Sequence, residues 1–117
     1  MTPAPTKAEI SVADFEKLDI RVGTIVAVAE VAGSRKLMKL NVDLGDHRRS
    51  VLAGIRQERS DPQVLVGQQA LFVVNLPVRK MAGELSEGML FDIGYADGLS
   101  PVLAVPEAAL ANGARAG

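Results

Sequence analysis

The sequence from Arg49 to Asn75, RSVLAGIRQERSDPQVLVGQQALFVVN, indicates a strand, a short helix and a second strand. Aliphatic and β-branched residues predict strands over Arg49–Ile55 and Gln69–Asn75. Between them, Asp61-Pro62 is typical of a helix start, because aspartate caps a first turn and proline fits its first position. Gly67 is typical of the end of that helix. This order of elements decides the fold class.

Further strands are predicted on both sides of this unit. Ile20–Val31 is rich in β-branched residues, and Gly23 within it indicates a bulge or a bend. Over Met38–Leu44 apolar and polar residues alternate, which predicts a strand with one buried face and with Lys39 on the other. Gly88–Gly94 predicts a fifth strand. Five strands with a short helix between the third and the fourth describe an all-β, five-stranded Greek-key barrel, the OB-fold.

The two ends of the chain are predicted to add a helix and an extension to the barrel. Ser11 and Asp14 have the spacing of a capping box, so a helix of about two turns is expected over Val12–Leu18. A helix this short must pack on another surface to be stable. Residues 1–9 are predicted to be a disordered tail before a domain over residues 10–114. Pro106–Gly117 is predicted to be a C-terminal extension with weak structural signal.

The residues that metal and catalytic sites require are missing. The chain has no cysteine and one histidine, His47, which lies in a predicted turn without other ligands at metal-binding spacing. No phosphate-binding glycine loop, HExxH or GxSxG motif occurs. We therefore expect no metal, no cofactor and no enzyme activity. No apolar run reaches the roughly 20 residues of a membrane span and no secretory signal is present, so a cytoplasmic protein is expected.

The connection between the fourth and fifth strands, Asn75–Met89, has the sequence NLPVRKMAGELSEGM, which is richer in functional groups than a turn requires. OB-folds bind ligands on strands 2 and 3 and on the 1–2 and 4–5 loops. Arg79 and Lys80 lie in one of these loops, and Lys36 lies in the other. Between residues 35 and 59 there are seven bases and three acids, Glu58 included, although the net charge of the chain is −1. Because aromatic residues are scarce, phosphate contacts are favoured over base stacking.

Four segments together resemble the tRNA-binding domain family. They are DFEKLDIRVGTIVAVAEV at 14–31, KLMKLNVDLG at 36–45, AGIR at 53–56 and VVNLPVRKMAGELSEGM at 73–89. This family of OB-fold proteins includes stand-alone members and the C-terminal domain of bacterial methionyl-tRNA synthetases, and it is related to the export chaperone CsaA. The resemblance covers nearly the whole chain and is closer to the synthetase type than to CsaA.

The resemblance implies structure-specific, sequence-tolerant binding of the tRNA elbow through phosphate and ribose contacts. It also implies a homodimer formed through the N-terminal helix and the C-terminal segment. Two alternatives remain open at this point. One is a CsaA-like export chaperone that binds unfolded polypeptides, and the other is an accessory subunit that acts in trans on an aminoacyl-tRNA synthetase.

Eight residues are candidate RNA contacts, and most of them have a plain structural alternative. The cations are expected to contact phosphate, the amide and the hydroxyl to bond ribose or backbone, and the methionine to pack on a base or ribose. The alternatives are solvated charges for the cations, turn capping for the amide and the hydroxyl, and core packing for the methionine. The candidates are Lys36, Lys39, Arg56, Asn75, Arg79, Lys80, Ser86 and Met89.

Overall fold

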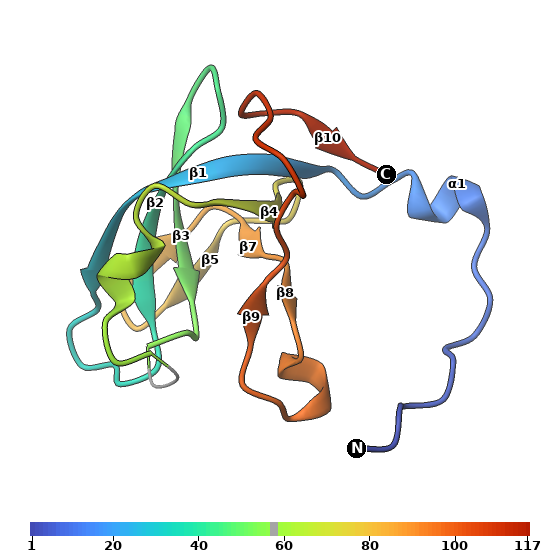
Figure 1. Cartoon of the computed structure of the whole chain (residues 1–117), viewed down its shortest axis with the longest axis horizontal. Coiled ribbons are helices and arrows are strands. Elements are labelled where there is room, and N and C mark those ends of the chain that lie inside the picture. The colour runs from blue at the N-terminus through green and yellow to red at the C-terminus, as the bar shows by residue number, and fades with distance from the viewer. Residues whose placement is uncertain (57–58) are drawn as a thin grey trace.

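Strand β1 (Ile20–Glu30) is the central strand of a curled antiparallel sheet (Figure 1). The computed structural model describes residues 1–56 and 59–117, so Glu58, one of the three acids between residues 35 and 59, lies outside the described residues. The strand order is β3-β2-β1-β4-β7. The other bounds are Met38–Asp43 for β2, Arg48–Ala53 for β3, Gln69–Val73 for β4 and Met89–Leu90 for β7. The predicted all-β fold of the OB type is confirmed.

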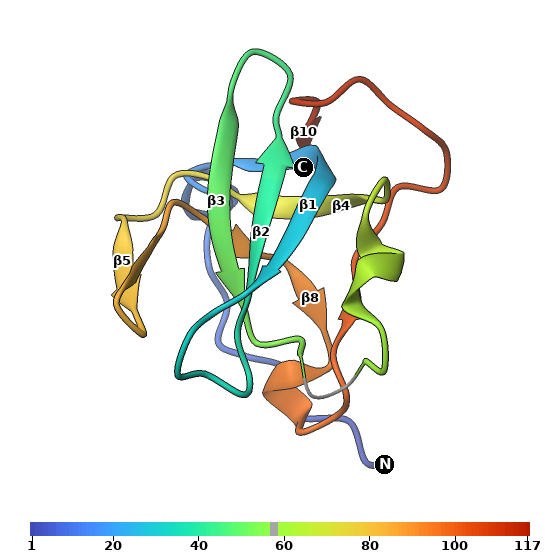
Figure 2. The same cartoon turned by 90° about the vertical axis from the view of Figure 1, so that its left-hand side faces the viewer.

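The alternation predicted for the second strand is present in β2. Met38, Leu40 and Val42 are buried, and the polar residues between them are only partly buried. The inward residues join a cluster with Ile25 and Phe72, the latter 1% exposed. Burying a side chain of this size stabilises the fold by about 1.5–3 kcal/mol. On the opposite face β2 carries the partly buried Lys39, Asn41 and Asp43, while Leu52 of β3 is buried there. Figure 2 shows β2 and β3 toward the viewer.

Strand β1 serves two parts of the sheet because it changes partners along its length. Ile20–Thr24 pairs with β4 and Thr24–Glu30 pairs with β2. The register shifts between Ile25 and Ala27, so the irregularity of β1 lies a few residues beyond Gly23, where a bulge or a bend was predicted. Gly23 has a packing role instead, since a Cβ there would lie 2.5 Å from Val42 Cγ1.

The predicted helix between the third and fourth strands is a single 3-10 turn, η1 (Pro62–Leu65). Asp61 caps it by accepting from the Gln63 amide at 3.1 Å, as expected from the Asp-Pro pair. Gly67 follows with φ of 91°, a conformation that favours glycine. Leu65 is buried and anchors the turn to the core.

The N-terminal helix is shorter than predicted. α1 covers Val12–Phe15 only, and Ser11 caps it by accepting from the Asp14 amide at 3.0 Å. The Asp14 carboxylate bonds Lys17 instead of the cap. None of the residues of α1 is buried, which removes the packing that a longer helix would need.

The 4–5 connection contains a hairpin that the sequence analysis did not predict. Strand β5 (Arg79–Met81) pairs with β6 (Glu84–Ser86) through a turn at Ala82 and Gly83. Both turn residues have positive φ, at 50° and 81°, as a two-residue type I′ turn requires. The basic residues of this loop are therefore held on a defined β-ribbon.

The fifth predicted strand is divided in two, which corrects its predicted extent. β7 pairs with β4, whereas β8 (Asp92–Ile93) pairs with β9 (Val102–Leu103), and η2 (Tyr95–Asp97) lies between β8 and β9. The last hydrogen bond to β4 in this region is donated by the Phe91 amide to Leu71 O, and the following residues pair with β9 instead.

The C-terminal extension is more ordered than its sequence predicts. β10 (Arg115–Ala116) pairs with Ile20 and Arg21 of β1, and the Gly113 amide donates to Val22 O at 2.7 Å. Within the described part of the chain, no helix has both the length and the apolar character needed to cross a membrane.

Candidate nucleic-acid interface

The β5–β6 hairpin lies along the free edge of β3, beside the outer face of β2 and β3. The Leu52 amide of β3 donates to Ser86 Oγ at 3.0 Å, and the Glu87 amide donates to Ser50 O at 2.8 Å. Lys39 Nζ of β2 lies 3.5 Å from Glu84 Oε1 of β6. The structure therefore places the second strand next to the 4–5 connection. Both regions were predicted to contribute to a binding site.

Lys39 and Arg79 are on the same side of this surface. In the hairpin, Arg79 stands opposite Ser86 and Met81 opposite Glu84, so these four side chains share one face. Because Glu84 reaches Lys39, that face is the one turned toward β2. Lys80 stands opposite Leu85 on the other face of the ribbon. Of these two neighbouring cations, Arg79 is therefore the better placed to bind the same ligand as Lys39.

The 1–2 loop is held in place by Arg56. Its guanidinium donates to Ser34 O at 2.7 Å and to Glu30 Oε1 at 3.0 Å, and its amide donates to Lys36 O at 3.0 Å. These bonds assign Arg56 a positioning role, while Lys36 itself is exposed. A hollow of about 500 Å³ lies between this loop and Arg56.

Ser86 is committed to internal bonds. Its side chain is buried, at 3% exposure, and Oγ both accepts from the Leu52 amide and donates to Gly88 O at 2.9 Å. This geometry matches the turn-capping alternative, and we leave Ser86 out of the contacts proposed below.

Ser86→Ala is expected to destabilise the fold by about 1–3 kcal/mol, because it leaves the buried Leu52 amide without an acceptor. Urea unfolding measures this change, and Ser100→Ala, at an exposed serine, is the control. RNA affinity should change by less than about twofold. A large loss of affinity at unchanged stability would instead make Ser86 a ligand contact.

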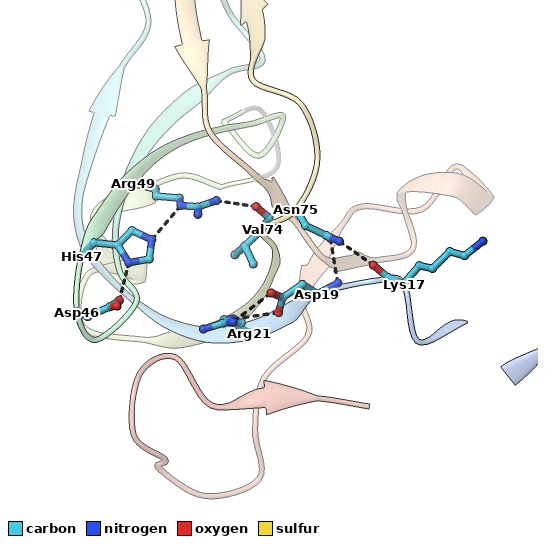
Figure 3. A network of polar contacts seen from close by, with 8 residues as sticks. All are labelled: Lys17, Asp19, Arg21, Asp46, His47, Arg49, Val74 and Asn75. Atoms are coloured by element: carbon cyan, nitrogen blue, oxygen red, sulfur yellow. Dashed lines mark hydrogen bonds and ion pairs between the residues drawn. The ribbon is translucent and has the colours of Figure 1, made fainter. Parts of the chain in front are cut away.

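Asn75 also makes internal bonds, although it remains exposed. Its Nδ2 donates to Lys17 O at 2.7 Å and its Oδ1 accepts from the Asp19 amide at 2.9 Å (Figure 3). The side chain therefore ties the start of the 4–5 connection to the N-terminal segment. Both ends of its amide are used, so its contact with RNA has less support than that of the cations.

Met89 lies at the surface, at 42% exposure, next to buried Leu90. It does not occupy the core, which was the alternative to a ligand contact. Apolar side chains of the 4–5 connection are exposed nearby in sequence: Leu76, Val78 and Leu85. Flexible and apolar groups of this kind suit a base, a ribose or an unfolded peptide.

His47 forms part of a polar network that the sequence analysis did not predict. Its Nδ1 lies 2.6 Å from Asp46 Oδ1, and its Nε2 accepts from Arg49 Nε at 3.0 Å (Figure 3). The hydrogen bond from His47 is the main cause that lowers the pKa of Asp46. In the described residues, no group of three or more potential metal ligands is present. The bond between Arg49 and His47 depends on the conformation of the turn before β3, which the sequence alone does not reveal.

A second ion pair lies beside this network. Arg21 donates to Asp19 through Nε at 2.9 Å and Nη2 at 3.1 Å, and this bond is the main cause that lowers the pKa of Asp19. Arg115 and Arg49 act in the same direction through their charge. The end of the barrel near Asn75 thus holds several paired charges, whereas Arg79 and Lys80 make no ion pair within the described residues.

The chain belongs to the family described as "Putative tRNA binding domain", whose model matches residues 20–115. Two similar curated proteins are methionine–tRNA ligases. The one from Chlorobium chlorochromatii is 46% identical over 92 residues, which is 79% of this chain and 13% of the relative. The one from Clostridium tetani is 45% identical over 84 residues, with 72% and 13% covered. The chain therefore spans about an eighth of the length of these relatives.

Two solved structures have nearly the same fold. The "MetRS related protein" from Pyrococcus horikoshii has a TM-score of 0.85 and 32% identity, covering 94% of this chain and 99% of that one. The chaperone CsaA from Bacillus anthracis has a TM-score of 0.83 and 32% identity, covering 94% and 100%. Both types of relative expected from the sequence are thus found, and the resemblance to this family is confirmed.

Proposed function

We propose that this protein binds tRNA through the outer face of β2 and β3 and the adjoining hairpin, in a non-catalytic and sequence-tolerant way. The observation that carries this proposal is that Arg79 shares the ribbon face of Glu84, which reaches Lys39, in a chain of the tRNA-binding domain family. The tRNA elbow fits such a site, because a folded corner presents phosphates and ribose hydroxyls from several strands to one surface.

The cations of this surface are available for phosphate. Lys39 and Glu84 have side chains that are 39% and 37% exposed, and an exposed pair of this kind contributes at most about 1 kcal/mol. A phosphate can therefore take the place of Glu84 at little cost. Lys36 of the 1–2 loop and Arg79 of the hairpin are also exposed, with Lys80 on the other face of the ribbon.

We also propose that the protein acts as a homodimer. Large apolar side chains are exposed on the N-terminal segment and on the β8–β9 region. They include Val12 at 72% and Phe15 at 45% in the first group, with Tyr95 at 69% and Val102 at 53% in the second. Apolar surface is stabilised when it is removed from water, and a second copy of the chain would cover these side chains. Two copies of the basic surface would then share one tRNA.

A second candidate function is the binding of unfolded polypeptide. It is favoured by the structural similarity to CsaA chaperones and by the exposed side chains of Leu76, Val78 and Leu85. A third, action in trans on an aminoacyl-tRNA synthetase, is favoured by the methionine–tRNA ligase relatives.

The first two candidates are separated by measuring both activities on the native chain. We expect bulk tRNA to be retarded in a native gel at low micromolar protein, and an unfolded client to aggregate at the same rate with and without the protein. Suppressed aggregation without tRNA retardation would contradict the proposed function and support the chaperone alternative. Adding tRNA to a client assay shows whether one surface serves both ligands.

A further inference from the structure

Both ends of the 4–5 connection are bound by one side chain, Arg49. Its Nη1 donates to Val74 O at 2.6 Å, where the connection begins, and to Glu87 O at 3.1 Å, where it ends. Arg49 is at the end of the inward face of β3, since it stands opposite buried Val42. The connection between these two carbonyls carries Arg79 and Lys80, and hydrogen bonds to a charged donor are among the stronger ones.

Arg49 is held in turn by His47. The guanidinium Nε–H needs an acceptor, and the bond to Nε2 at 3.0 Å uses the lone pair of a neutral imidazole. The other ring nitrogen then carries the proton that is donated to Asp46 Oδ1. Figure 3 shows the resulting line from Asp46 through His47 and Arg49 to the Val74 carbonyl.

We propose that Arg49 is a positioning residue for the basic hairpin, and that neutral His47 keeps Arg49 in the orientation that joins the two ends of the connection. The consequence for tRNA affinity rests on the proposed function, whereas the effect on the hairpin does not. A side chain without an acceptor at the position of Nε2 would leave the Arg49 Nε–H unbonded, so the guanidinium would lose this orientation and the hairpin would loosen.

Charged groups lie on both sides of the His47 ring. Asp46 faces Nδ1, and the bond from His47 lowers the pKa of its carboxyl. Arg49 faces Nε2. Arg21 of β1, paired with Asp19, acts on Asp46 through its charge, and Arg115 of β10 lies near the same pair. The Glu87 carboxylate accepts from the Ser50 amide.

Hydrogen exchange in the free protein tests the positioning role without RNA. In Arg49→Gln we expect the amides of residues 79–86 to exchange roughly tenfold faster, because two bonds to a charged donor are removed. The matched control is Arg48→Gln, which removes the same charge from the neighbouring exposed residue and should leave these amides unchanged. Unchanged exchange in Arg49→Gln would overturn the proposal.

A pair of substitutions tests the part played by His47. In His47→Phe, which has no acceptor for Arg49 Nε, the hairpin amides should exchange several-fold faster. His47→Gln supplies a carboxamide oxygen that can accept from Arg49, so most of the protection should be kept. Unchanged exchange in His47→Phe would overturn the role of His47.

A tRNA titration completes the test. Arg49→Gln should weaken binding by roughly threefold to tenfold, because the ligand must then order the hairpin. Absence of tRNA binding by the native chain, with the exchange results as expected, would reject the proposed function while supporting the positioning role. Unchanged affinity in an Arg49→Gln variant that has a loosened hairpin would show that the hairpin does not bind tRNA.

Discussion

The double substitution Lys39→Gln and Arg79→Gln is expected to weaken tRNA binding by roughly tenfold to a hundredfold at about 0.1 M salt. Both cations lie on one side of the ribbon and the sheet, so a phosphate backbone that contacts one can contact the other. The slope of log affinity against log salt should also become shallower by about one for each phosphate that is no longer bound. All tRNAs should be affected alike, because phosphate contacts carry no sequence information.

Two single substitutions show whether this effect is local. Lys7→Gln removes a charge from the exposed N-terminal segment and should leave affinity and slope unchanged. Lys80→Gln removes a charge from the far face of the ribbon and should have a smaller effect than Arg79→Gln. Equal decreases in affinity in all variants would mean that only net charge matters, and an unchanged affinity in the double variant would exclude this surface.

Val12→Asp combined with Val102→Asp is expected to convert the proposed dimer to a monomer. Both valines are more than half exposed in the single chain, and a carboxylate placed in an apolar interface would be buried without a partner. The loss of the second basic surface should lower tRNA affinity by roughly tenfold to a hundredfold, since the two surfaces no longer bind one molecule together.

Light scattering measures the mass of this variant. The control is Val64→Asp, at a valine in η1 that is 59% exposed and lies outside the proposed interface. Val64→Asp should remain dimeric and should bind tRNA as the native chain does. A native chain with the mass of a monomer would contradict the dimer, and so would a double variant that remains dimeric with full affinity.

The fold could be predicted where the pattern is local. The alternation over Met38–Leu44 gave the correct buried face, and Asp61-Pro62 gave the correct position and cap for the turn between β3 and β4. The β5–β6 hairpin was missed because Ala82, at its first turn position, is not a residue that typically has positive φ. β10 was missed because its two residues pair with β1 far away in the sequence.

The candidate site was predicted in part. The structure brings two of the predicted regions together, because the 4–5 connection and β2 meet through Lys39 and Glu84. The division of roles was not visible, since Ser86 and Leu52 are 34 residues apart and Asn75 and Lys17 are 58 apart. The sequence showed Arg49 only as one of the seven bases between residues 35 and 59, although its side chain joins both ends of the 4–5 connection. Such assignments depend on long-range geometry, which neither spacing nor composition encodes.

The most direct test of the central claim is a tRNA titration of the native chain at about 50 mM and about 200 mM salt, with the solution mass of the complex measured in parallel. We predict one tRNA bound per dimer and an affinity that falls by at least about tenfold between the two salt concentrations. Absence of binding at the lower salt concentration, or an affinity that does not change with salt, would contradict a tRNA-binding surface built from Lys36, Lys39 and Arg79.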